Sequence, residues 1–146
     1  MKHDLKFNVA QCNVSYNKKI GTLRGMHYQV TPHEEAKLIR CTAGIIYDVT
    51  VDLRPESPTY KQWFGIKLTA LSRRMVYVPE GVAHGYLSLV DNSIVYYLVS
   101  VFYHKESERT LRWDDSSIGI NWHKMDEYVT MDKYIISEKD RNANNI

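Results

Sequence analysis

Short apolar runs separated by turn-forming residues recur through the middle of this chain, and they restrict the folds that it can adopt. Five such runs occupy residues 44–53, 63–71, 75–81, 84–90 and 94–103. They are rich in Val, Ile and Tyr, with Pro, Gly, Asn or Asp in the breaks, as is typical of strands joined by turns. No segment before residue 123 has the pattern of a helix longer than one or two turns. The sequence therefore predicts an all-β sandwich or barrel, with short helical turns only after residue 123.

Two of the runs predict different surroundings for their side chains. Alternation in residues 45–53 assigns one face to Ile46, Asp48, Thr50 and Asp52, and the other face to Ile45, Tyr47, Val49, Val51 and Leu53. We expect the second face to be core and the first to meet a polar cavity or solvent. The run 93–103 is almost continuously apolar, so we expect one of its faces to meet the core and the other a pocket or a partner.

Composition narrows the class of protein. The chain has 146 residues, with 19 Lys and Arg against 17 Asp and Glu, which indicates one globular domain over residues 1–146. A net charge of +2 argues against general nucleic-acid binding.

Cys12 and Cys41 fit no zinc-binding spacing and are expected to be buried or partly buried thiols in a reducing compartment. Without a signal-like or membrane-spanning apolar run, a cytoplasmic protein with no membrane partner is expected. We expect the last six residues to be frayed.

Two polar segments contain the residues that could support chemistry. Residues 21–41 and 78–89 resemble the two halves of the cupin signature, whose positions fall here on Gly21, His27, Gln29 and Glu34, and then on Pro79, Gly81 and His84. Metal-binding cupins have a second histidine where this chain has Gln29, so one imidazole ligand is missing. Three hypotheses remain open: a metal site on His27, Glu34 and His84, a metal-free site with His27 as base, or histidines that are merely hydrogen-bonded within the barrel.

Further motifs occur in a fixed order along the chain: LRGMHYQ at 23–29, PHEEAKLIRC at 32–41, IYDVTVDLRPESPTYKQW at 46–63, RRMVYVPEGVAHGYLSL at 73–89, YY at 96–97, ESERTLRWDDSSIGINW at 106–122 and SEKD at 137–140. Together they resemble the nucleotide-sugar 3,5-epimerases, which convert dTDP-4-dehydro-6-deoxyglucose into dTDP-4-dehydrorhamnose. The resemblance implies a cupin-type jelly-roll β-sandwich, a homodimer and an isomerase that needs no metal or other cofactor. It also implies a role in dTDP-rhamnose and cell-surface polysaccharide synthesis, such as that of lipopolysaccharide.

The resemblance also implies roles for individual residues. Epimerisation beside a ketone needs a base, a group that stabilises the enolate, and an acid. The family pattern assigns these roles to His27, Lys37 and Tyr97 in turn, with Asp140 orienting His27. The substrate-binding positions of the family correspond to Gln11, Asn13, Arg24, Arg40, His84 and Tyr103. The two arginines suit a diphosphate, although surface ion pairing is the alternative for them.

The chain departs from the family pattern at several places. Typical members carry a further N-terminal segment, with an Asp-x-Arg-Gly motif, that shapes the nucleotide cleft and crosses the dimer interface. We expect this chain to lack that extension. The stretch between Trp122 and SEKD is longer than usual, which leaves Asp126 and Asp132 as alternative partners of His27. Ala36, Leu98, Val101 and Phe102 also replace usual residues. A 3-epimerase or ketoisomerase on a related nucleotide sugar, or a shortened homologue that only binds, are the rival functions.

Overall fold

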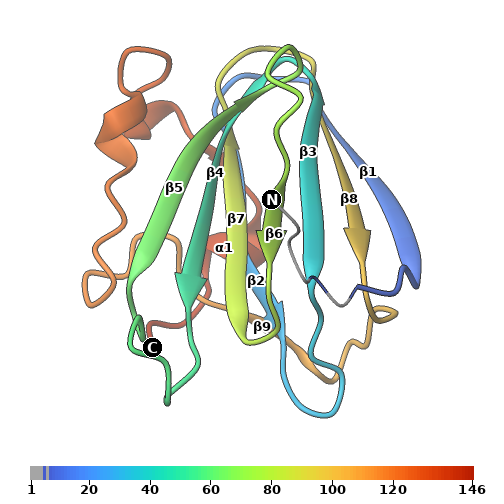
Figure 1. Cartoon of the computed structure of the whole chain (residues 1–146). Coiled ribbons are helices and arrows are strands. Elements are labelled where there is room, and N and C mark those ends of the chain that lie inside the picture. Colours follow the sequence, from blue (N-terminus) through green and yellow to red (C-terminus); the bar gives the residue numbers. More distant parts are fainter. Residues whose placement is uncertain (1–4, 6) are drawn as a thin grey trace.

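Two β-sheets face one another in the computed structural model, which describes residue 5 and residues 7–146 (Figure 1). The four-stranded sheet has the order β1-β8-β3-β6, made of Gln11–Asn17, Ser93–Val99, Lys37–Ala43 and Val76–Val78. The other sheet has the order β10-β2-β7-β4-β5, made of Ile135–Ile136, Thr22–Gln29, Val82–Ser88, Ile45–Asp52 and Trp63–Thr69, and β9 (Glu108–Thr110) pairs with β2. All pairs are antiparallel except β10 with β2. The predicted jelly-roll β-sandwich is confirmed.

The last apolar run ends earlier than its sequence predicts. Strand β8 stops at Val99, and residues 100–103 leave the sheet although they remain apolar. The Ser100 hydroxyl accepts a hydrogen bond from the Ala36 backbone N–H at 2.8 Å, and the Gln29 side chain accepts one from the His104 N–H at 2.6 Å. These polar contacts tie residues 100–104 to the end of β2 and to the loop that leads into β3. Tyr103 therefore lies on a loop and not in a strand.

The space between the two sheets holds one hydrophobic core. Its buried members come from both sheets and are Ile39, Cys41, Ile46, Leu68, Val78, Val82, Tyr86 and Val95. The polar face predicted for residues 46–52 points into this space, with Asp48 only 1% exposed. That prediction is confirmed: apolar residues fill part of the interior, and buried polar side chains occupy the rest.

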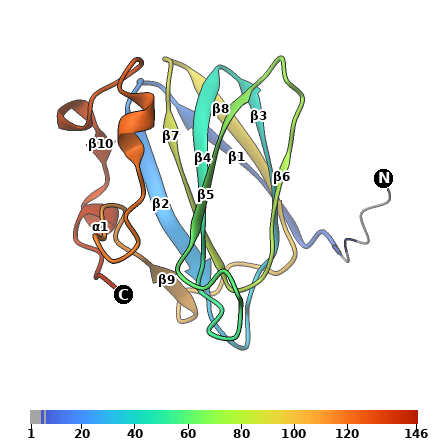
Figure 2. The ribbon, with the colours of Figure 1, turned by 60° about the vertical axis from the view of Figure 1, so that its left-hand side comes forward.

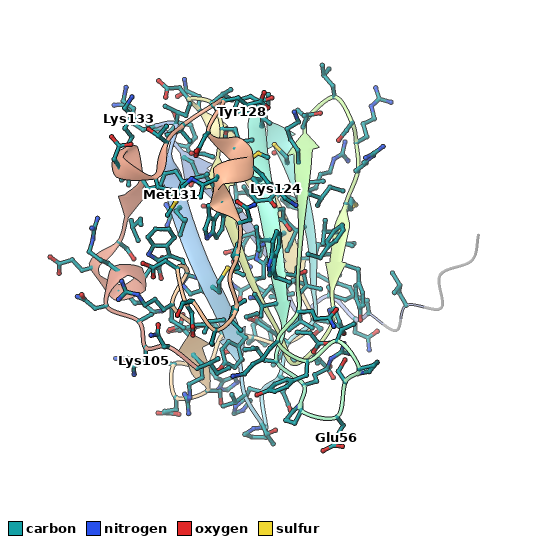
Figure 3. The ribbon with its side chains drawn as sticks, turned by 90° about the vertical axis from the view of Figure 1, so that its left-hand side faces the viewer. Glu56, Lys105, Lys124, Tyr128, Met131 and Lys133 are labelled. Atoms are coloured by element: carbon teal, nitrogen blue, oxygen red, sulfur yellow. The ribbon has the colours of Figure 1, made fainter. Side chains whose placement is uncertain are left out.

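A second core lies on the outer side of the larger sheet. The C-terminal segment crosses this face (Figure 2), where Trp113, Trp122 and Tyr134 pack against residues that include Tyr47 and Val49. The segment contains two single-turn 3₁₀ helices, η1 (Trp122–Met125) and η2 (Met131–Lys133). They agree with the short helical turns that the sequence predicts. Figure 3 shows Lys124, Tyr128 and Met131 along it. Both faces of β4 are therefore buried, each against a different layer.

The chain's last residues are held in place, which contradicts the predicted fraying. After the single-turn helix α1 (Glu138–Arg141), Asn144 pairs with Leu111, and the Ile146 N–H donates to the Asp115 carboxylate at 2.8 Å. No helix among the described residues has the length and apolar character needed to cross a membrane.

The outer face of the four-stranded sheet has no comparable layer over β1 within the described chain. Val14 and Tyr16 are 67% and 54% exposed there. Cys12 lies on the same face of β1 and is exposed, so the prediction that both cysteines are buried is wrong for Cys12 and right for Cys41. Alternate residues of β1 point away from the interior, which places Cys12 outside.

Candidate active site

Two adjoining cavities open between the sheets and share three of the predicted catalytic residues. One has a volume of about 190 Å³ and is lined by Ser15, Arg24, His27, Lys37, His84, Tyr86 and Tyr97. The other has a volume of about 320 Å³ and is lined by Gln11, Asn13, His27, Glu35, Lys37, Tyr97, Val99, Tyr103 and Glu108. Because His27, Lys37 and Tyr97 line both, we treat the two as one space and name it the cleft.

A β-bulge turns two side chains of β2 into the cleft. Arg24 and His27 are three residues apart, so a regular strand would point them to opposite faces. The pairing of β2 with β7 shifts register between these two residues. Gly25 has a φ of +127°, and a Cβ on it would lie 2.5 Å from the Cα of Gly85 on β7. Two facing glycines thus let the backbones approach closely enough for the bulge, and both Arg24 and His27 reach the cleft.

His27, whose side chain is 33% exposed, forms a dyad with the buried Asp140. The His27 Nε2 lies 2.6 Å from Asp140 Oδ1, and Asp140 Oδ2 accepts the Gly25 backbone N–H at 3.3 Å. Burial opposes ionisation of this carboxyl, but the hydrogen bond and charge of His27, together with the Gly25 N–H and Ser137, hold its pKa below the usual range. A carboxylate at Nε2 favours a proton on that nitrogen and leaves Nδ1 free to accept one.

The SEKD motif has a structural role at this dyad. Ser137 is the N-cap of α1, and its hydroxyl accepts the backbone N–H of Asp140 at 3.1 Å. The cap fixes the turn that carries the Asp140 carboxylate. The alternative partners lie elsewhere: Asp126 is 3.0 Å from His123, and the Asp132 carboxylate is associated with Thr130.

Lys37 and Tyr97 enter the cleft from the opposite sheet. They lie on adjacent strands, where Lys37 pairs with Val99 and Tyr97 pairs with Ile39. The Lys37 ammonium donates to the His27 carbonyl at 3.2 Å and lies 2.9 Å from the Glu35 carboxylate. Desolvation raises the pKa of the Tyr97 hydroxyl, with smaller contributions from Tyr86 and Glu35 and an opposing one from Arg24.

A second His–Asp pair lies beside the first, and sequence reasoning identified only its histidine. The His84 Nε2 is 2.8 Å from Asp48 Oδ2, and the other oxygen of Asp48 is buried with no hydrogen-bond partner in the part of the chain that the structure describes. His84 also pairs in the β-ladder with His27, so both imidazoles come from neighbouring backbone positions. Asp48 could have been identified from the sequence, because it belongs to the predicted polar face of its strand.

The wider end of the cleft carries further groups. Gln11 donates to Asn13 at 2.7 Å, and Tyr103 donates to the Glu108 carboxylate at 2.9 Å. Glu108 also lies 2.5 Å from the Lys139 ammonium, next to Asp140 in α1. The sequence predicted Gln11, Asn13 and Tyr103 but missed Glu108, because nothing in its local pattern distinguishes it from the other charged residues of the polar segment around β9.

One predicted binding residue lies outside the cleft. Arg24 lines the cleft, and its Nε donates to Asn17 at 3.1 Å. Arg40 is three residues from Lys37 in β3, where the pairing with β8 is regular from Lys37 to Cys41, so it points to the outer face of the sheet. Arg40 therefore does not line the cleft, unlike Arg24. Its Nε is buried without a partner among the described residues.

Of the ligand positions in the metal-binding pattern, only the two histidines line the cleft. The Gln29 amide is only 2% exposed, donates to the His33 carbonyl and accepts from the His104 N–H, so it joins two loops. The Glu34 carboxylate accepts from the Thr31 hydroxyl at 2.7 Å. Neither lines the cleft. Among the described residues, no three His, Cys, Asp or Glu side chains form a group that could hold a metal ion.

Comparisons with known proteins agree on one family. The family model for dTDP-4-dehydrorhamnose 3,5-epimerase matches residues 1–146. The enzyme of that name from Sinorhizobium fredii is 43% identical over 125 residues, which are 86% of this chain and 64% of that protein. This chain therefore spans slightly less than two thirds of the length of that relative.

Solved structures agree with the sequence comparison. The dTDP-4-dehydrorhamnose 3,5-epimerase from Bacillus anthracis, with TDP and PPi bound, has a TM-score of 0.90 at 41% identity, over 97% of this chain and 77% of that chain. ChmJ, a 3′-monoepimerase from Streptomyces bikiniensis in complex with dTDP-quinovose, has a TM-score of 0.83 at 34% identity, over 94% of this chain and 66% of that chain.

Proposed function

Because this chain belongs to the dTDP-4-dehydrorhamnose 3,5-epimerase family, we propose that it converts dTDP-4-dehydro-6-deoxyglucose into dTDP-4-dehydrorhamnose. The reaction inverts C3 and C5, the two carbons that flank the 4-keto group. It makes the protein an isomerase in nucleotide-sugar biosynthesis. The observation that carries the proposal is the convergence of His27, Lys37 and Tyr97 in the cleft, with Asp140 directly behind His27.

The proposed mechanism uses these groups in turn. His27 Nδ1 removes the proton beside the ketone, and Asp140 stabilises the imidazolium that forms. The Lys37 ammonium stabilises the negative charge that develops on the keto oxygen. Tyr97 then protonates the enolate on the other face of the ring. Support for this last role comes from position: His27 belongs to one sheet and Tyr97 to the other, so a ring bound between the sheets has one on each side.

The remaining cleft residues are proposed to bind the substrate. Arg24 suits the diphosphate, because a guanidinium donates to two phosphate oxygens at once. Gln11, Asn13 and Tyr103 line the wider end of the cleft, where we assign the nucleotide. His84, fixed by Asp48, is assigned to the keto sugar. The two free thiols are consistent with a reducing compartment, and we propose the cytoplasm as the location.

We also propose a homodimer that forms through the outer face of the four-stranded sheet. Val14 and Tyr16 are exposed on this face although they are apolar and aromatic. A second copy of the same face would cover the exposed apolar surface, as an isologous interface does.

The reaction can be tested by incubating the protein with dTDP-4-dehydro-6-deoxyglucose in deuterated water. Each inversion replaces a carbon-bound proton with one from solvent, so deuterium is expected at both C3 and C5, as measured by NMR. Deuterium at C3 alone would establish the second candidate, a 3-epimerase, which the similarity to ChmJ favours. If neither carbon gains deuterium, the chain is not an epimerase of this sugar.

A further inference from the structure

We propose that Glu35 is a positioning residue that holds the Lys37 ammonium in place and directs one of its N–H groups into the cleft. The proposal rests on the proposed epimerase function, in which Lys37 stabilises the enolate. Glu35 does not touch the reacting carbons in this account. It acts through Lys37 alone.

The first support is the geometry of the ammonium. A lysine ammonium has three N–H donors. One lies 2.9 Å from Glu35 Oε1, and a second is directed at the His27 carbonyl at 3.2 Å. The third has no partner among the described residues. Since Lys37 lines both cavities together with His27 and Tyr97, the third donor is the one available to a keto oxygen there.

The second support is burial. The side chains of Lys37 and Glu35 are only 8% and 12% exposed. A buried ammonium is costly unless an anion and further acceptors surround it. Among the described residues, Glu35 is the only carboxylate within ion-pair distance of Lys37, and Lys37 is the only cation within that distance of Glu35. Without Glu35, the ammonium would keep one carbonyl contact in a cleft that also contains Arg24 and two histidines.

The neighbouring glutamate provides a matched control. Glu34 is adjacent in sequence, but its carboxylate accepts from Thr31 and does not line the cleft. Glu34→Gln and Glu35→Gln remove the same charge from the same loop with the same change of shape. An effect that depends only on the net charge of the loop would therefore appear in both variants.

The contact itself can be tested without the enzymatic reaction. Each variant is acetylated briefly with acetic anhydride, and the modification of Lys37 is measured by mass spectrometry relative to the other lysines of the same protein. Acetylation requires that the reagent reach the amine nitrogen, and the contact at 2.9 Å with Glu35 restrains the Lys37 nitrogen within the cleft. We expect Glu35→Gln and Glu35→Ala to raise the Lys37 rate several-fold over wild type, and Glu34→Gln to leave it unchanged. An equal Lys37 rate in wild type and both Glu35 variants would overturn the proposal.

The consequence for catalysis is tested by kinetics. Loss of correct positioning is expected to lower kcat in Glu35→Gln by about 100-fold, with KM nearly unchanged because the substrate contacts remain. Glu34→Gln should keep the wild-type kcat. A wild-type kcat in Glu35→Gln would refute the role in catalysis, and so would a raised KM with kcat unchanged. If wild-type protein itself shows no exchange, the proposed function fails, and the acetylation result still decides whether Glu35 holds Lys37.

Discussion

His27 and Tyr97 reach the cleft from opposite sheets, and this separation gives each residue its own effect on the reaction. A base that removes a proton can return one from solvent to the same carbon face. Inversion needs a second donor on the other face. Removing the proton and completing the inversion are therefore distinct events, which two single substitutions can separate.

We predict that His27→Ala abolishes both deuterium exchange and epimer formation. Tyr97→Phe is expected to lower epimer formation by about 100-fold to 10,000-fold while the recovered substrate still gains deuterium through His27. NMR of substrate and product in deuterated water measures both. Tyr60→Phe, in the loop after β4, should match wild type. If Tyr97→Phe forms epimer at the wild-type rate, Tyr97 is not the acid.

Spacing within strands shows how far the site could be predicted at this scale. Arg24 and His27, like Lys37 and Arg40, are three residues apart. Strand alternation assigns each pair to opposite faces, which is correct for the second pair and wrong for the first because of the bulge at Gly25. The family pattern supplied the identities of the catalytic residues. It could not supply Glu35, whose role depends on a buried ion pair that forms only in the folded chain.

Among the elements, the loop that joins β4 to β5 depends on one buried carboxylate. Asp52 accepts hydrogen bonds from the Arg54 backbone and side chain, Ser57 and Thr59, at 2.6–3.0 Å. The hydrogen bonds from Arg54 hold the pKa of Asp52 far below its usual range, and those from Ser57 and Thr59 add to this against the effect of burial. The folded protein therefore binds this proton more weakly than the unfolded chain does.

We predict that Asp52→Asn lowers the free energy of unfolding by about 2 kcal/mol at pH 7. Because the folded pKa is lowered, this stabilisation is complete above about pH 4, the usual pKa of the unfolded carboxyl, and it is lost as the pH falls further. Urea unfolding at pH 7 and pH 3 should therefore show a smaller difference from wild type at pH 3. Glu56→Gln, in the same loop and pointing into solvent (Figure 3), serves as the control. An equal difference at both pH values would contradict the argument.

The C-terminal segment contributes a core that the sequence did not predict. The pattern identified the apolar face of β4 but not its cover, because residues from 123 onward look polar and the segment has almost no regular structure. Trp122 lies at the centre of the contact between this segment and β4. It is 1% exposed, it donates to the Trp113 carbonyl at 2.9 Å, and its ring lies edge-on to Tyr47.

We predict that Trp122→Ala lowers the free energy of unfolding by about 3–5 kcal/mol, through lost burial and the cavity that remains. Leu71→Ala, at a side chain that is 93% exposed, should change it by less than about 0.5 kcal/mol. Urea denaturation followed by tryptophan fluorescence and circular dichroism measures both. A small effect of Trp122→Ala would mean that the segment is not a structural layer.

At the scale of the whole molecule, the two sheets differ in what covers them. The larger sheet has the C-terminal segment on its outer face, whereas the smaller sheet leaves Val14 and Tyr16 exposed. We predict that the wild-type protein is a dimer in light scattering and that Val14→Lys shifts it toward the monomer, because the substitution buries a charge in the interface. Leu71→Lys adds the same charge at another exposed apolar site and should leave the dimer intact. A monomeric wild type would refute the proposed interface.

The two partners of the catalytic dyad are 113 residues apart in the chain. During translation, the strands that carry His27, Lys37, His84 and Tyr97 leave the ribosome well before Asp140 does. The sheets can therefore pair while the base still lacks its carboxylate, which arrives only with the capped turn at Ser137. A nascent chain can thus form the cleft before the His27–Asp140 dyad is complete. An incomplete copy that already has the cleft has no oriented base with which to remove a proton from a sugar.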